Sequence, residues 1–248
     1  MQAEVNRRVF VRSVAVGVPA LAGAAYGLAA ASPPNHEHDR AGDSHDLDPV
    51  LEHVVREIAS VIQRGQQRGF RGEDARAIAA QLRFAVVRGA QTGIDAAAKK
   101  GVHRLIRSRP RDAALSLEID TVKTRTQLKR YGIEVEDRWL MRGPLDEITR
   151  RKALDALAND GVTGVLAHAA DMFGKVSTSL DRVQVGPVRR VQFDSFFCWP
   201  LLAEIELLAA EAAAICAIGP VEPGLEVACS TLQATISVLI AVYYAYCH

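Results

Sequence analysis

The chain has 248 residues and a formal net charge of +1. Its four cysteines all lie in residues 198–248, the cysteine segment, at spacings that exclude a Cys-x-x-Cys-His haem attachment site and a zinc ribbon. The near-neutral net charge hides an uneven distribution of charge along the chain. Residues 49–197 carry 26 Lys or Arg and 18 Asp or Glu, a net charge of +8, whereas the cysteine segment carries five Glu and no Lys or Arg. These opposite charges favour docking of the cysteine segment on the residues before it.

The first residues carry an export pattern. Arg7 and Arg8 are followed by one residue and then Phe10, and an apolar run rich in Ala and Gly covers residues 14–28. Residues 1–31 resemble a twin-arginine (Tat) signal peptide, and the resemblance implies export of an already folded protein. The Ala-Ala-Ala at the end of this segment offers a cleavage site, and an uncleaved membrane anchor is the alternative.

Residues 32–48 are polar and poor in large apolar groups, which predicts a disordered linker. A helical pattern follows, because Asp48 can cap a helix and Pro49 can occupy its first position. The next apolar residues recur at spacings of three and four and predict one buried helix face: Val50, Val54, Ile58, Val61 and Ile62.

Further helices are predicted up to residue 181. A turn at residues 69–72 is followed by helical periodicity, interrupted by glycines, to about Ser108, where Pro110 stops it. We expect three more helices, over 113–130 (with Leu117, Val122 and Leu128 inward), over 145–158 and over 161–180. This length is enough for one core, so residues 49–181 are predicted to form a basic all-α domain.

Residues 182–197 are predicted to form an extended connector. Apolar and polar residues alternate over 183–193, and this stretch contains a Gly-Pro turn. Arg189 and Arg190 form a dibasic pair inside it and offer a candidate processing site. Cleavage there would separate the basic domain from the cysteine segment.

The cysteine segment has the pattern of a helical hairpin. The pair Cys198 and Cys247 and the pair Cys216 and Cys229 share one midpoint, which falls in the Gly-Pro-Val-Glu-Pro-Gly turn at 219–224. Within each arm the two cysteines lie 18 residues apart, or five turns of an α-helix. Both cysteines of an arm therefore face the same side.

Four cysteines allow three pairings. Pairing within an arm would join residues roughly 27 Å apart along a helix, and the crossed pairing would slide the arms by a similar distance. A disulfide needs its Cα atoms within about 7 Å. The nested pairing, Cys198–Cys247 with Cys216–Cys229, therefore remains, and the alternative is four free buried thiols. Disulfides persist outside the cytosol, in agreement with the export pattern.

The second arm of the hairpin, residues 225–247, has a single charge, Glu226, and its final stretch is apolar on all faces. Such a helix must be buried in protein or lie in a membrane, and its length just suffices to span a bilayer. We therefore expect the hairpin to dock on the basic helices or to contact a membrane or the cell envelope. The oligomeric state is left open.

No catalytic motif stands out. The sequence has no Gly-x-Ser-x-Gly, no His-Glu-x-x-His and no Walker loop. His168 with Asp171 and His53 with Glu57 could each meet on a helix face, but ordinary helix-face contacts have the same spacings. We expect no enzyme activity, no cofactor and no metal site. Three Arg-Gly steps over residues 64–72 resemble a nucleic-acid-binding segment, but Gly after a basic last turn is a common helix ending, so we expect no nucleic-acid partner.

The order of the segments resembles that of halocin-type bacteriocin precursors. Those proteins join a Tat signal and an immunity domain to a cysteine-rich C-terminal peptide. The resemblance implies that the basic domain shields an apolar, disulfide-stapled antimicrobial peptide. The alternative hypothesis is an exported binding or structural protein, in which the hairpin is an integral or membrane-contacting element. A third hypothesis, an enzyme with an unrecognised site, has no motif behind it.

Overall fold

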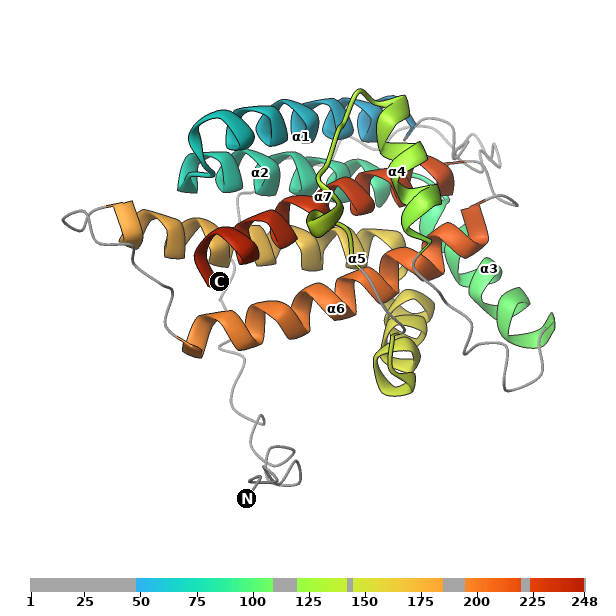
Figure 1. Cartoon of the computed structure of the whole chain (residues 1–248). Helices are drawn as coiled ribbons and strands as arrows, with labels where there is room; N and C mark the ends of the chain where they lie inside the picture. Colours follow the sequence, from blue (N-terminus) through green and yellow to red (C-terminus); the bar gives the residue numbers. More distant parts are fainter. Residues whose placement is uncertain (1–47, 109–119, 142–144, 185–194, 220–223, 248) are drawn as a thin grey trace, which may run out of the picture. The chain divides into compact units, whose positions relative to one another are not determined.

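The computed structural model describes residues 48–108, 120–141, 145–184, 195–219 and 224–247. These ranges contain seven α-helices, the 3-10 helix η3 and no strand (Figure 1). In chain order the elements are α1 (Asp48–Arg68), α2 (Gly72–Gly89), α3 (Ile94–Ser108), α4 (Thr121–Arg130), the 3-10 helix η3 (Asp137–Trp139), α5 (Glu147–Gln184), α6 (Ser195–Ile218) and α7 (Leu225–Cys247). The predicted all-α fold, with a disulfide-stapled helical hairpin at its C-terminal end, is confirmed.

Helix α1 buries one apolar face against α2 and α7. That face consists of the predicted residues, of which Val50 is only partly buried, together with Leu51 and Val55. Gly69 has a φ of 79°, a left-handed conformation that glycine adopts without steric cost. It ends α1 and donates its N–H to the carbonyl of Gly65 at 2.9 Å. The turn predicted at residues 69–72 therefore lies between α1 and α2.

The helical periodicity predicted as far as Ser108 is divided between α2 and α3. Thr92 lies in the turn between them, where its hydroxyl donates to the carbonyl of Gly89 at 2.8 Å and accepts from the N–H of Ile94 at 3.3 Å. The hydroxyl thus serves backbone groups at the end of α2 and the start of α3. Helix α2 packs along α5, and α3 packs against α5 and α6.

Helix α4 is shorter than the helix predicted over 113–130. Asp120 is extended (φ −77°, ψ 97°), and its carboxylate accepts the N–H groups of Val122 and Lys123 at 3.0 and 2.9 Å. An N-cap of this kind starts a new helix, so a continuous helix through residue 120 is wrong. Val122 is 71% exposed rather than inward, whereas Leu128 is fully buried as predicted. Leu117 lies outside the described residues.

Helix α5 contains a break at Gly161 (φ 72°, ψ −166°). Asp95 of α3 caps the second half, because its carboxylate accepts the N–H of Thr163 at 2.9 Å and the hydroxyl of the same residue at 2.6 Å. A Cβ at position 161 would lie 2.5 Å from the Asp95 carboxylate, so both the backbone angle and the close approach require glycine here. The break separates the two helices predicted over 145–158 and 161–180.

The predicted extended connector is shorter than expected at both ends. Helix α5 continues to Gln184 and α6 begins at Ser195, so 182–184 and 195–197 are helical rather than extended. Helical hydrogen bonding of the adjacent turns extends over these residues, which the short alternating pattern did not reveal. The remainder of the connector, with Arg189 and Arg190, lies outside the described residues.

Helix α7 occupies the centre of the packing. It contacts α6, α1, α4, α5 and η3, and Figure 1 shows it running between α1 and α6. Its buried apolar side chains belong to the same core cluster as those of α1, α2, α3 and α5. The cysteine segment and the basic helices therefore share one hydrophobic core, and the hairpin is docked.

Candidate functional site

Helices α6 and α7 form a hairpin closed by two disulfides. Cys198 is bonded to Cys247 near the open end, with 5.7 Å between their Cα atoms, and Cys216 is bonded to Cys229 near the tip, with a Cα separation of 5.0 Å. This is the nested pairing expected from the common midpoint. Both cysteines of each arm lie inside their helix. Bonds of this kind persist in an oxidising environment, which points to an extracellular or equivalent compartment.

Helix α7 is buried by the rest of the fold. It is the one helix among the described residues that is long and apolar enough to cross a membrane. However, 83% of its most apolar 18-residue window is buried inside the protein. Two threonine hydroxyls of this helix are also buried, since Thr231 and Thr235 donate to backbone carbonyls one turn earlier at 2.8 and 2.7 Å. Packing against the other helices therefore accounts for the all-round apolar pattern over most of this helix, and its last turn is partly exposed.

Three ion pairs join the hairpin to the basic helices. Each uses a carboxylate of the hairpin and a basic residue of the helices before it. The pairs are Glu204 with Lys175 of α5 at 2.8 Å, Glu211 with His168 of α5 at 3.1 Å, and Glu226 with Arg130 of α4 at 2.9 Å. The charge partition of the sequence thus appears in the structure as complementary contacts across one interface.

The Glu211–His168 pair differs from the other two because it is buried. The Glu211 side chain is only 4% exposed and that of His168 is 27% exposed. The hydrogen bond that His168 donates to Glu211 raises the pKa of His168 above its usual 6.5, against the opposing effect of desolvation, and the charges of Glu211 and Glu204 raise it further. The pair is therefore an electrostatic contact between α5 and α6 that depends on the protonation of one imidazole.

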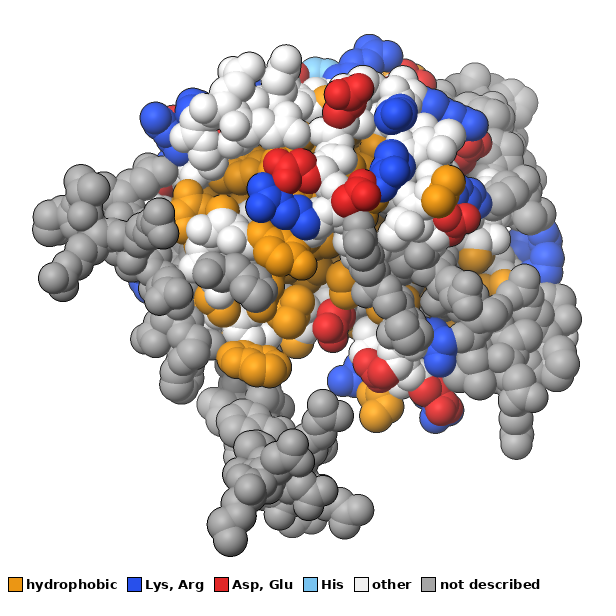
Figure 2. Space-filling model, in the orientation of Figure 1, with side chains coloured by type: hydrophobic (Ala, Val, Ile, Leu, Met, Phe, Trp, Pro, Cys, Tyr) orange, Lys and Arg blue, Asp and Glu red, His pale blue; other side chains and the backbone are white. Residues whose placement is uncertain are grey.

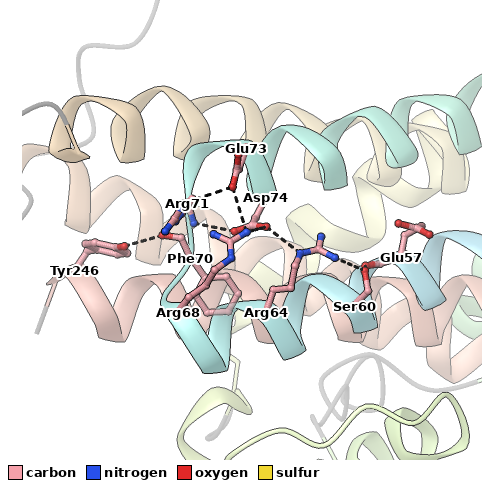
Figure 3. Close-up of polar contacts among 9 residues, drawn as sticks. All are labelled: Glu57, Ser60, Arg64, Arg68, Phe70, Arg71, Glu73, Asp74 and Tyr246. Carbon is pink, nitrogen blue, oxygen red and sulfur yellow. Dashed lines mark hydrogen bonds and ion pairs between the residues drawn. The ribbon is translucent and has the colours of Figure 1, made fainter.

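The end of α7 is fixed on the turn between α1 and α2. The hydroxyl of Tyr246 donates to the carbonyl of Phe70 at 2.8 Å (Figure 3). Burial raises the pKa of Tyr246, and the nearby charge of Asp74 raises it further, so the hydroxyl remains a hydrogen-bond donor. This contact joins positions 176 residues apart in the sequence.

The same turn is held by a carboxylate-centred network. Asp74 is 3% exposed and accepts the backbone N–H of Arg71 at 3.1 Å and the guanidinium of Arg68 at 3.0 Å, while the Arg64 guanidinium lies 3.5 Å away (Figure 3). Arg68 also pairs with Glu73 at 3.2 Å. The arginines of the three Arg-Gly steps thus point toward Asp74 and Glu73 and organise the turn that receives α7.

Two further contacts join the hairpin to α3 and α4. On α4, the hydroxyl of Thr124 accepts a hydrogen bond from the side-chain amide of Gln233 on α7 at 3.1 Å. On α3, Gly101 lies against Ile218 at the hairpin tip, where an added Cβ would come within 2.2 Å of the isoleucine side chain. The absence of a side chain at position 101 therefore lets α3 approach the end of α6.

Comparisons with protein-family models, with curated proteins and with solved structures gave no match.

Few of the residues singled out in the sequence are brought together. The four cysteines are brought together, in the two nested disulfide pairs. Arg7, Arg8 and Phe10 of the export pattern, like the dibasic pair of the connector, lie outside the described residues. The helix-face pair His168 and Asp171 does not form, because His168 bonds Glu211 and Asp171 lies 3.8 Å from Arg83.

The sequence reasoning missed the interface carboxylates and their partners. The available signal was the uneven distribution of charge, since Glu204, Glu211 and Glu226 lie in a segment without Lys or Arg and need partners from other helices. The helical periodicity does not show which basic residue each carboxylate contacts. Within the described part of the chain, no group of three His, Cys, Asp or Glu side chains is arranged to hold a metal ion.

Proposed function

We propose that this chain is an exported, non-enzymatic helical protein of the binding or structural class, and that its stapled hairpin is an integral element. The observation that carries the proposal is the position of α7, buried between α1, α6 and the other helices it contacts. The hairpin completes a core that the remaining helices share with it. A membrane-contacting hairpin, the other form of this proposal, would require α7 to leave those helices.

Export rests on two independent features. The two disulfides require an oxidising environment, and residues 1–31 resemble a Tat signal. The Tat route also suits a protein whose first described helix packs on its last one, because that route carries folded proteins. Replacing both Arg7 and Arg8 by lysine should leave the protein in the cytoplasm of a Tat-competent host, with Arg12→Lys as the matched control. Unchanged export of the double variant would rule out this route.

The integral role of the hairpin is tested by truncation. Removing residues 198–248 uncovers the apolar faces of α1 and α5, so we expect a chain that aggregates. The control is the full-length chain with Arg189→Gln and Arg190→Gln, which should stay soluble and melt cooperatively. A truncated chain that is soluble and melts cooperatively would show that the helices before residue 198 form a complete core without the hairpin.

A second candidate function is the bacteriocin-like precursor. Two features favour it: the segregation of charge between the basic helices and the hairpin, and the three ion pairs that use this segregation. In this form of the proposal the basic helices shield an apolar antimicrobial hairpin until cleavage near Arg189 and Arg190. Non-reducing intact-mass measurement on culture medium decides between the two. A fragment containing both disulfides establishes release, and full-length mature protein alone excludes it.

A further inference from the structure

A cleft of about 540 Å³ opens where η3 meets the open end of the hairpin. Most of its lining is apolar and comes from three elements: Leu140 and Met141 after η3, Leu202 and Ile205 on α6, and Ile240 on α7. Figure 2 shows hydrophobic side chains gathered over α6 and α7 on this face of the molecule. The volume falls within the range of about 300–1,000 Å³ that is typical of small-molecule sites.

Two adjacent tyrosines form another wall of the cleft. Tyr243 and Tyr244 lie with their ring centroids 6.0 Å apart and their planes at 79°. Tyr244 is 40% exposed, so part of this aromatic surface faces solvent. Aromatic faces attract cations as well as apolar groups, and this attraction strengthens where water is excluded.

Three charged residues complete the lining, and one of them differs from the others. Asp137 pairs with Arg125, and Arg138 pairs with Glu136. Glu206, which is half-buried on α6, makes no hydrogen bond or ion pair with any residue that the structure describes. Its carboxylate shares the cleft with the apolar and aromatic side chains, and the guanidinium of Arg138 in the same lining is paired with Glu136.

The contrast with the rest of the hairpin is informative. Glu204, Glu211 and Glu226 each meet a basic residue of the preceding helices, so the described carboxylates of the hairpin are otherwise paired. A half-buried carboxylate without a counter-ion is electrostatically unfavourable in an apolar setting. A ligand that brings a positive charge into the cleft would remove this cost and gain a charge-assisted contact.

We propose that the cleft between η3, α6 and α7 binds a small organic cation, a substituted ammonium with an apolar body, and that Glu206 is its counter-ion. The apolar body packs on the aliphatic lining and the ammonium group lies between the carboxylate and the tyrosine rings. This site uses other residues than the three ion pairs that join the hairpin to the basic helices, and it gives the protein a ligand-binding activity beyond its proposed structural role.

The test uses the full chain with both disulfides formed, and benzyltrimethylammonium as the probe. Calorimetric titration should show saturable binding of the probe. The uncharged isostere neopentylbenzene and the anion phenylacetate should bind at least tenfold more weakly, because neither supplies a positive charge. Equal affinity for the three compounds, or no binding of the cation, would overturn the proposal.

A matched pair of variants locates the charge contact. Glu206→Gln should weaken probe binding at least fivefold. Glu204→Gln, on the same helix but paired with Lys175 outside the cleft, should leave it within twofold of the wild type. If both substitutions have the same effect, or neither has any, Glu206 is not the counter-ion.

A readout that needs no substitution locates the ligand. Met141 lines the cleft, whereas Met172 is buried in the core on α5, so the two methyl groups report on different places. With ¹³C-methyl methionine, the probe should shift the resonance of Met141 and leave that of Met172 in place. A shift confined to Met172, or no shift at saturating probe, would place the ligand elsewhere and overturn the assignment.

Discussion

The Oε2 atom of Glu211 lies 3.1 Å from the Nδ1 atom of His168, across the interface between the stapled hairpin and the basic helices. Because Glu211 is almost completely buried, its carboxylate is hydrogen-bonded by this partner and is largely shielded from water. The pair makes one contact of the docked hairpin sensitive to pH.

The direction of that sensitivity follows from the pKa of His168, which is raised from 6.5 by the hydrogen bond that the imidazole donates to Glu211. A raised pKa in the folded state means that the stabilisation is fully present below pH 6.5 and is lost as the pH rises through the folded-state value. We expect His168→Gln to lower the free energy of unfolding by about 1–3 kcal/mol at pH 6. The difference from the wild type should shrink in alkaline solution.

Chemical denaturation across this pH range checks the prediction. The charged groups nearest His168, besides Glu211, are Glu204 and Lys175, which pair with each other. Lys175→Gln is therefore the matched control, and it should cost no more than about 1 kcal/mol because that pair is largely exposed. A His168→Gln effect that is the same at every pH would contradict the assignment of a charged imidazole.

The two disulfides should contribute unequally to stability. The Cys198–Cys247 bond closes a loop with a sequence separation of 49, and the Cys216–Cys229 bond one with a separation of 13. In the chain-entropy treatment, removal costs about 4 kcal/mol for the first and about 3 kcal/mol for the second. Denaturation of the two double-serine variants measures the difference. A larger loss for the shorter loop would mean that local packing at the tip outweighs loop entropy.

The close approach of α3 to the hairpin tip predicts the effect of adding one methyl group. Gly101→Ala places a Cβ 2.2 Å from the side chain of Ile218, so we expect a loss of about 1–3 kcal/mol in the free energy of unfolding. Gly174→Ala on α5 is the control, since the nearest atom to its added Cβ is a flexible arginine nitrogen at 3.5 Å. That substitution should be neutral or stabilising by up to about 1 kcal/mol. Equal changes in the free energy of unfolding at both positions would show that the contact between Gly101 and Ile218 is not the cause.

Helix α4 offers a direct test of which apolar side chains matter. Val122 is 71% exposed and Leu128 is fully buried, although the sequence pattern assigned both to the inward face. We expect Val122→Ala to change the free energy of unfolding by less than about 0.5 kcal/mol and Leu128→Ala to lower it by about 2–5 kcal/mol. Thermal or urea unfolding distinguishes the two, and a costly Val122→Ala would indicate that α4 packs in another rotation.

The hairpin and its pairing could be predicted because the constraints were internal to one segment. A common midpoint, a turn at that midpoint and an 18-residue helical spacing together leave one geometry for the four cysteines. Helix existence was also predictable from apolar spacing in α1, α2 and α5. The start of α4 was missed because a single aspartate, Asp120, caps the helix and ends the apparent continuity of the pattern.

The contacts between helices could not be predicted in the same way. Periodicity assigns a residue to a face but not to a partner, so the pairing of Glu211 with a histidine 43 residues earlier was not visible. The cleft beside Glu206 could not be predicted for the same reason, since its walls come from both arms of the hairpin and from η3, which lies much earlier in the sequence. The uneven distribution of charge along the sequence indicated that the carboxylates of the hairpin need basic partners. Which basic residues they meet is determined by the packing of the helices.

The packing of α1 on α7 has a consequence for synthesis. More than 150 residues separate the end of α1 from the start of α7, and translation proceeds at roughly 5–20 residues per second. For on the order of ten seconds, the side of α1 that α7 will cover has no permanent partner. Newly made chains should therefore depend on chaperones in this interval, and the arrival of α7 is the event that ends the dependence.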